Sequence, residues 1–135
     1  MSTKKDKFTS QDKMFMDIAL KLAETRHGLT GPNPSVGCVI VKNNNIISVG
    51  RTSINGRPHA EFNAIKDCTE NLEDSKMYVT LEPCCHLGLT PPCTDLIIKS
   101  KISEVIYSVT DIDKRVRNKS FKILNSKKII VKKDC

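Results

Sequence analysis

Gly56-Arg57-Pro58-His59-Ala60-Glu61 decides the fold of this chain when it is taken together with Pro83-Cys84 and Cys93 further along. The imidazole of His59 and the thiols of Cys84 and Cys93 are three candidate zinc ligands. Three protein ligands leave the fourth tetrahedral position to water, which is typical of a catalytic zinc and not of a structural one. Glu61 need not bind the metal, so it can carry protons between that water and a substrate nitrogen.

The spacing of these residues also indicates a class of reaction. His-x-Glu followed later by Pro-Cys is the signature of the zinc-dependent base deaminases. Each part alone is weak evidence, since a single cysteine is more often a small buried hydrophobe than a ligand. Cys85 is a rival for Cys84, but Cys84 follows the proline directly, as the signature requires. The other cysteines are interpreted as core or incidental residues: Cys38, Cys68 and Cys135.

Size and composition exclude several classes of protein. A chain of 135 residues is expected to form one domain whose core needs no disulfides. No apolar run reaches the ~20 residues of a membrane span, and the polar start lacks the apolar segment of a secretion signal. A cytoplasmic protein with reduced cysteines is therefore expected. The formal net charge of +7 is scattered, and aromatic residues make up only 4%, so nucleic acid is not the expected partner.

Hydrophobic periodicity predicts an α/β sandwich with helices on both faces of a sheet. Residues 1–11 are expected to be a flexible tail and residues 12–135 a single domain. The first helix is predicted over 12–28, where a glycine can take the left-handed cap. Later helices are predicted to start near His59, near Pro91-Pro92 and around Phe121, between strands at 36–41, 46–50, 77–81, 105–109 and 129–131. The first two strands form a hairpin, and the order places His59 and the segment 84–93 at one edge of the sheet.

Three segments of the sequence resemble one enzyme family. They are 32–41, 56–61 and 80–93, the last with Glu-Pro-Cys-Cys-His and Thr-Pro-Pro-Cys. Over about 14–131 the chain resembles the deaminase domain of the bacterial riboflavin-biosynthesis deaminase/reductases, within the cytidine/deoxycytidylate deaminase superfamily. The resemblance includes the long spacing from Cys84 to Cys93, where most cytidine and tRNA adenosine deaminases carry Pro-Cys-x-x-Cys.

This resemblance implies a fold, a reaction and a set of site residues. The fold is a cytidine-deaminase-like three-layer α/β/α sandwich with a mixed five-stranded sheet. The reaction is the zinc-dependent hydrolysis of 2,5-diamino-6-(5-phosphoribosylamino)pyrimidin-4(3H)-one to 5-amino-6-(5-phosphoribosylamino)uracil and ammonia, an early step of riboflavin biosynthesis. Also implied are a homodimer formed through helices, and the following residues: His59, Cys84 and Cys93 as ligands of Zn²⁺, Glu61 as proton shuttle, and Asn33, His86 and Asp111 as substrate contacts.

The chain departs from the family pattern where the family binds the substrate phosphate. Leu89 stands where the family usually carries Lys or Arg, and an apolar side chain cannot replace a charged phosphate contact. A basic cluster beyond Asp111 is expected to supply the charge, through Arg115, Arg117 or Lys119. Altered or weakened activity is the alternative that Leu89 leaves open.

Other readings of the sequence also stay open. The chain stops at Cys135 and shows no Gly-rich dinucleotide loop, so the reductase is expected on another chain, or that step is met elsewhere. A nucleoside, nucleotide or tRNA base deaminase is the main alternative function, and the positive charge favours it. A catalytically weakened zinc-binding domain is the other alternative, which the presence of Glu61 opposes.

Overall fold

The computed structural model describes residues 7–85 and 91–135 of the chain. His86 and Leu89, on which the sequence placed a substrate contact and a departure from the family pattern, lie outside the described residues. Within the described ranges, every helix is too short or too polar to cross a membrane.

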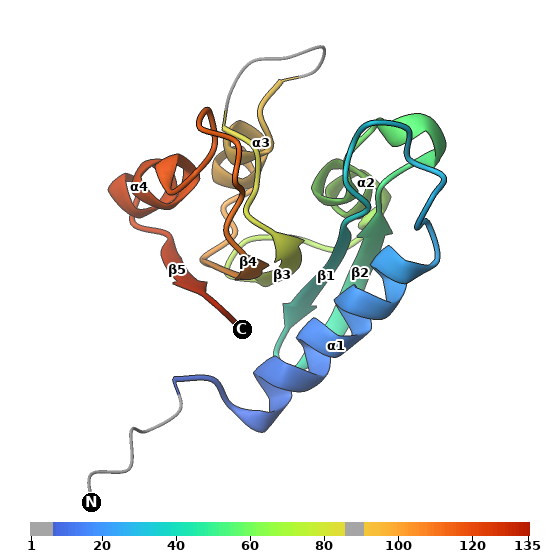
Figure 1. Ribbon diagram of the computed structural model, residues 1–135. Coiled ribbons are helices and arrows are strands. Elements are labelled where there is room, and N and C mark those ends of the chain that lie inside the picture. Colours follow the sequence, from blue (N-terminus) through green and yellow to red (C-terminus); the bar gives the residue numbers. More distant parts are fainter. Residues whose placement is uncertain (1–6, 86–90) are drawn as a thin grey trace, which may run out of the picture.

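Five strands form one mixed sheet in the order β2-β1-β3-β4-β5 (Figure 1). Their bounds are β1 Gly37–Lys42, β2 Asn45–Arg51, β3 Lys76–Leu81, β4 Glu104–Val109 and β5 Ile130–Lys133. β1 pairs antiparallel with both β2 and β3, whereas β3, β4 and β5 run parallel to one another. The predicted hairpin and the mixed five-stranded sheet are therefore confirmed.

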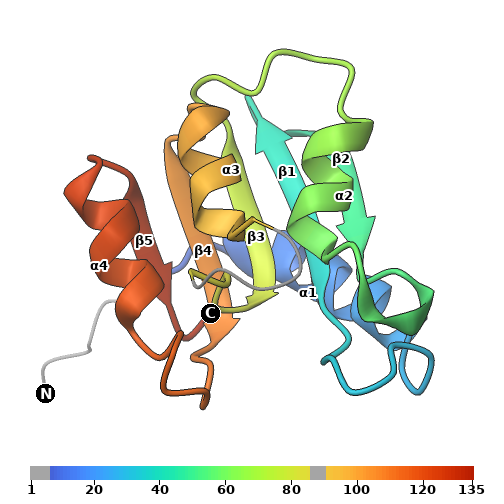
Figure 2. The same cartoon turned by 90° about the horizontal axis from the view of Figure 1, so that it is seen from above.

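Helices cover both faces of this sheet. Figure 2 shows α1 (Ser10–Glu24) on one face, and α2 (Ala60–Asp67), α3 (Cys93–Lys99) and α4 (Lys119–Ser126) on the other. A short 3₁₀ helix, η1 (Ile54–Gly56), precedes α2. The buried residues of β1 alternate between two clusters: Cys38 and Ile40 pack under α2, α3 and α4, whereas Val39 and Val41 pack against α1. The three-layer α/β/α sandwich is confirmed.

The first helix begins and ends earlier than predicted. It starts at Ser10, because Thr9 and Asp12 form a capping box in which each side chain accepts the backbone N–H of the other. Phe8, in the segment predicted to be a flexible tail, is 8% exposed and packs in the core with α1. The predicted tail of residues 1–11 is thus too long at its C-terminal end. The helix ends at Glu24, where the hydroxyl of Thr25 donates to the Leu22 carbonyl at 2.6 Å.

A glycine lets α2 lie directly against the edge strand β2. A Cβ atom placed on Gly50 would lie 2.3 Å from the carbonyl oxygen of Ala60 and 2.6 Å from the backbone nitrogen of Ala64. Real Cβ atoms do not approach so closely, so only glycine permits this packing. The contact sets the height of α2 above the sheet, and with it the position of His59 at the start of the helix.

Candidate functional site

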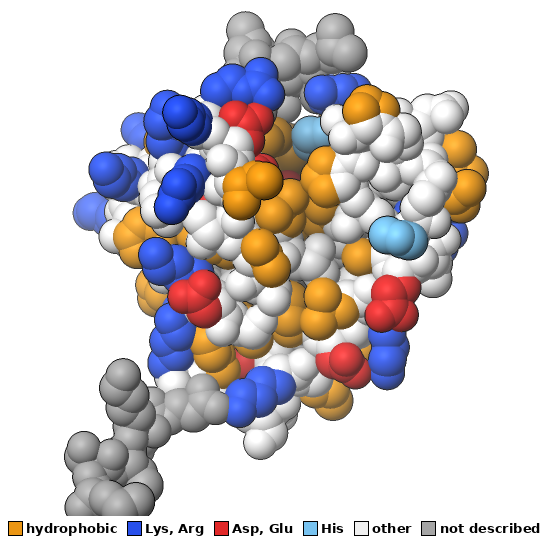
Figure 3. Space-filling view, in the orientation of Figure 1, with side chains coloured by type: hydrophobic (Ala, Val, Ile, Leu, Met, Phe, Trp, Pro, Cys, Tyr) orange, Lys and Arg blue, Asp and Glu red, His pale blue; other side chains and the backbone are white. Residues whose placement is uncertain are grey.

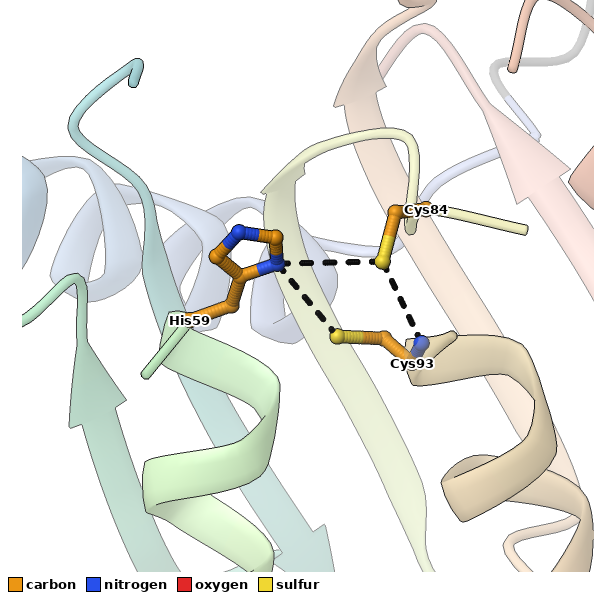
Figure 4. A group of neighbouring side chains, drawn as sticks. All are labelled: His59, Cys84 and Cys93. Atoms are coloured by element: carbon orange, nitrogen blue, oxygen red, sulfur yellow. Dashed lines mark hydrogen bonds between the residues drawn. The ribbon is translucent and has the colours of Figure 1, made fainter. Parts of the chain in front are cut away.

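Three separate elements bring His59, Cys84 and Cys93 together (Figure 4). His59 is the N-cap of α2, Cys84 lies in the turn after β3, and Cys93 is the first residue of α3. His59 Nδ1 lies 3.7 Å from the Sγ atom of each cysteine. The backbone N–H of Cys93 also donates to Cys84 Sγ at 3.2 Å. Residues far apart in the sequence thus converge at the edge of the sheet that the sequence analysis had indicated.

The donor atoms of this group suit zinc. One imidazole nitrogen and two sulfurs lie within 4.8 Å of one another. A tetrahedral zinc with its usual bond lengths would place a ligating nitrogen and sulfur about 3.5 Å apart, close to the observed 3.7 Å. Mixed nitrogen and sulfur donors favour zinc over the harder cations magnesium and calcium. The residues present therefore fit a zinc ion held by His59, Cys84 and Cys93.

The ionisation of the two thiols differs. The pKa of Cys84 is lowered to about 4, because the Cys93 side chain donates a hydrogen bond to it and His59 lies beside it, which together outweigh its burial. The pKa of Cys93 is raised, by its hydrogen bond to Cys84 first and by burial second. The pKa of His59 is raised by its hydrogen bond with Cys84. Cys84 is therefore held in the thiolate form, which is the form that binds metals.

Glu61 is buried beside these three residues. It is the second residue of α2 and is 4% exposed. Burial raises the pKa of its carboxyl group to about 7, and the negative charge of Cys84 adds to the effect. Glu61, His59 and Cys84 all line one cavity of about 150 Å³. A carboxylate that titrates near neutrality is suited to both taking and giving a proton.

Charged side chains also line the cavity. Figure 3 shows a hollow near the top of the view, in which a His side chain is visible beside acidic and basic side chains. The charged residues that line the cavity, apart from His59 and Glu61, are Arg57, Glu82, Asp111, Asp113 and Arg115. The site therefore has a metal-ligating side and a side that can bind a polar, charged substrate.

Two of the three predicted substrate contacts lie at this cavity. Asn33 lines it, and its Nδ2 donates to the carbonyl oxygen of Gly56 at 3.1 Å. Asp111 lines it too, and its Oδ1 accepts the backbone N–H of Asp113 at 2.9 Å. The third, His86, is outside the described residues.

The predicted basic cluster contributes one residue to the described lining of the cavity. Arg115 is among its lining residues, whereas the described lining does not include Arg117 or Lys119. The guanidinium group of Arg115 forms an ion pair with Asp113 through three hydrogen bonds, with nitrogen–oxygen distances from 2.7 to 3.2 Å. Among the three candidates for the phosphate charge, the geometry favours Arg115.

Cys85 points away from the metal-ligating group. Its Sγ donates to the carbonyl oxygen of Arg115 at 3.3 Å, and it is not one of the three clustered donors. Cys38 is fully buried in the core. Cys68, interpreted from the sequence as a core or incidental residue, is the half-buried C-cap of α2.

Sequence reasoning missed three charged residues of the cavity, Arg57, Glu82 and Asp113. Arg57 stands next to the His-x-Glu motif, and an arginine beside a metal site was a signal that could have been used. Glu82 directly precedes Pro83-Cys84 and is 2% exposed. An acidic residue at the end of a buried strand is unusual, since charged side chains are almost never fully buried without partners.

Comparison with known proteins agrees with this geometry. The zinc-binding region of the cytidine and deoxycytidylate deaminases matches residues 9–109. The riboflavin biosynthesis protein RibD of Chlamydia muridarum is 51% identical over 108 residues, which are 80% of this chain and 29% of that protein. The diaminohydroxyphosphoribosylamino-pyrimidine deaminase of Buchnera aphidicola is 44% identical over 122 residues, 90% of this chain and 83% of that protein.

A solved structure is similar as well. The chain matches the diaminohydroxyphosphoribosylaminopyrimidine deaminase/5-amino-6-(5-phosphoribosylamino)uracil reductase of Thermotoga maritima with a TM-score of 0.87 and 39% identity. The match covers 92% of this chain and 36% of that one. The chain thus spans only about three tenths of the length of the RibD relatives that it matches. The family match covers most of the chain, so this protein belongs to the cytidine and deoxycytidylate deaminase family and carries its zinc-binding region.

Proposed function

We propose that this chain hydrolyses 2,5-diamino-6-(5-phosphoribosylamino)pyrimidin-4(3H)-one to 5-amino-6-(5-phosphoribosylamino)uracil and ammonia, an early step of riboflavin biosynthesis. The observation that carries the proposal is the buried Glu61 beside the group of His59, Cys84 and Cys93 on the wall of one cavity. The name of the Buchnera aphidicola relative, most of which this chain spans, supports the same substrate. Residues from Phe8 onward would form the deaminase domain, since Phe8 packs in the core.

The residues of the metal side have distinct proposed roles. His59, Cys84 and Cys93 would hold the zinc ion, which when bound supplies Lewis-acid activation of water. Glu61 would accept a proton from the attacking water. It would then pass that proton to the ring nitrogen of the substrate. In the next step it would take a second proton, from the hydroxyl group formed on the attacked carbon, and give it to the amino group that leaves as ammonia. One carboxylate can serve as base and then as acid because its pKa of about 7 lies near neutral pH.

The other side of the cavity would recognise the substrate. Because Asn33 uses Nδ2 to bind Gly56, its Oδ1 is the atom that can accept an N–H group of the pyrimidine. Asp111 would accept a ribose hydroxyl. Arg115 and Arg57 line the cavity and would bind the phosphate, since a guanidinium group matches a phosphate with paired hydrogen bonds. This assignment explains how the chain could dispense with a charged residue at position 89.

The assembly and the compartment are also proposals. A homodimer would bury the apolar hollow beside the site, whose lining includes Phe62, Pro91 and Leu96. A single species of monomer mass in light scattering at micromolar concentration would contradict it. The cytoplasm is the proposed compartment, because all six cysteines are free and metal-binding thiols must stay reduced.

Ammonia release from the purified, zinc-loaded protein tests the reaction. The phosphorylated diaminopyrimidine should release ammonia with wild-type protein, and Glu61→Gln should abolish this while zinc content stays the same. Cytidine, deoxycytidine monophosphate and a tRNA anticodon stem-loop serve as comparison substrates. Release from one of these and not from the diaminopyrimidine would refute the proposed substrate, and no release from any of them would indicate a domain without activity.

A further inference from the structure

Glu82 is a buried carboxylate that connects the two sides of the cavity. It follows β3, precedes Pro83-Cys84 and is only 2% exposed. Its Oε1 accepts the backbone N–H groups of Asp111 at 3.3 Å and of Asn118 at 3.1 Å. Its Oε2 accepts the hydroxyl of Ser120. All three donors come from the segment between β4 and the first turn of α4, so a single carboxylate holds that segment.

The segment that Glu82 holds carries the charged wall of the cavity. We define the β4–α4 loop as residues 110–118. In this loop Asp111 accepts the N–H of Asp113, and Asp113 in turn binds the guanidinium group of Arg115. Arg115 is 67% exposed, and an exposed ion pair alone holds a side chain only weakly. The direction of Arg115 therefore depends on where the loop backbone is anchored.

The anchor is strong because it is charged and buried. Within the described parts of the chain, no Lys or Arg forms an ion pair with Glu82. The backbone N–H groups of Asp111 and Asn118 and the hydroxyl of Ser120 are thus the partners that stabilise its carboxylate. Hydrogen bonds to an ionised acceptor are roughly twice as strong as neutral ones. Moving the loop would leave a buried carboxylate without partners, which is costly.

The position of Glu82 in the chain gives this anchor a function. Only Pro83 separates it from Cys84, whose thiolate lies in the metal-ligating group. The turn after β3 therefore carries both the loop anchor, Glu82, and the metal-side residue Cys84, two positions apart. A change in the anchor alters the distance between the reacting centre and the charged wall, while His59 and Cys93 keep their own supports in α2 and α3.

We propose that Glu82 is a positioning residue for the substrate, which sets the β4–α4 loop so that Arg115 meets the substrate phosphate. The inference rests on the proposed function, because it assigns Glu82 a role in binding that phosphorylated substrate. Glu82 acts through the loop and does not take part in the proton transfers of Glu61. Its loss should therefore raise KM for the phosphorylated diaminopyrimidine, with much less effect on kcat and on zinc content.

Steady-state ammonia release by substituted proteins tests this role. Glu82→Ala should raise KM about tenfold, the effect of losing one charge-assisted hydrogen bond, with kcat within about threefold of wild type. Glu82→Gln retains a carbonyl acceptor and offers an N–H to the Ser120 hydroxyl, so it should restore most of the affinity. Ser120→Ala removes a single bond and should raise KM about threefold. This milder variant decides the question if Glu82→Ala does not fold.

A second buried carboxylate provides the matched control. Glu104 is 6% exposed and lies at the opposite end of the sheet, where it binds Lys76 at 3.4 Å and Lys132 at 3.0 Å. Glu104→Ala should lower the melting temperature as Glu82→Ala does, but leave KM within twofold of wild type. An increase in KM that both variants share would show a general loss of stability, and would overturn the positioning role.

A double-variant cycle separates positioning from independent effects. Arg115→Ala should raise KM about tenfold, and Glu82→Ala/Arg115→Ala should raise it no further, since both changes remove the same contact. An increase of about a hundredfold in the double variant, or an unchanged KM in Glu82→Ala and Ser120→Ala, refutes the role of Glu82. A wild-type protein that releases no ammonia refutes the proposed function instead, so the two failures are distinguishable.

Discussion

Replacing Gly50 by alanine should damage the site without touching any residue that lines it. Gly50 lies in β2, under the first turns of α2. The new Cβ atom would lie 2.3 Å from the carbonyl oxygen of Ala60 and 2.6 Å from the backbone nitrogen of Ala64. Both of these atoms are backbone, so no side-chain rotation relieves the overlap. Helix α2 must rise from the sheet, and His59 and Glu61 must rise with it.

The size of the effect follows from the overlap. Restoring ordinary contact at 3.4 Å requires the Ala60 carbonyl to retreat from 2.3 Å, a shift of about 1 Å in a close-packed interior. Overpacking of this kind costs ~1–3 kcal/mol of unfolding free energy, or about 3–12 °C in melting temperature for a domain of this size. A displacement of about 1 Å in the reacting groups can lower kcat/KM by ~100-fold.

Thermal unfolding followed by circular dichroism, zinc content and ammonia release would measure these effects together. Gly28→Ala is the matched control, since Gly28 has φ +82° and no atom within 4 Å of a built Cβ. It should lose about 1–2 kcal/mol through backbone strain and retain wild-type activity. If Gly50→Ala retains activity within twofold of Gly28→Ala, α2 does not depend on this contact and the reasoning is wrong.

Two further predictions concern the opposite face of the sheet and the metal ligands. Burial alone would raise the pKa of Asp12, but hydrogen bonds from Tyr78 (2.6 Å) and Thr9 lower it below its usual value. A lowered folded-state pKa stabilises the fold above the unfolded pKa of about 4, and this contribution is lost as pH falls through the folded value. Tyr78→Phe should therefore lower the melting temperature at pH 7, by a difference that shrinks between pH 5 and pH 3; a difference independent of pH would contradict the assignment. Cys93→Ser should weaken zinc binding by more than the ~10–100-fold typical of a lost partner of a ligand, measured by competition with a chromophoric chelator, whereas Cys85→Ser should leave it unchanged; equal losses in both would remove the distinction between the two cysteines.

Local patterns in the sequence predicted most of the fold. A strand at 36–41 was predicted in a sheet covered by helices on both faces, and the residues of β1 do alternate between two buried clusters. The asparagine turn after it indicated a hairpin, and Asn43 and Asn44 both have positive φ, at 52° and 64°. These features depend on neighbours in the sequence, so a single chain reveals them.

Features that depend on distant partners were not predicted. Phe8 was assigned to a flexible tail, because its burial in the core appears only in the folded chain. The same reason applies to the site. The motif residues His59, Cys84 and Cys93 were singled out by their spacing, whereas the bonds of Glu82 to residues 111–120 become visible only when β3 and β4 lie side by side.

The division of the cavity into two walls has a consequence for how this fold can diversify. The zinc donors come from the starts of α2 and α3 and from the turn after β3, whereas the β4–α4 loop contributes Asp111, Asp113 and Arg115 and no donor to that group. Substitutions, insertions or deletions within the loop would change which amino-substituted ring can bind in the cavity. The metal-ligating residues and Glu61 would remain unchanged. A lineage built on this plan could acquire new substrates by remodelling one short loop.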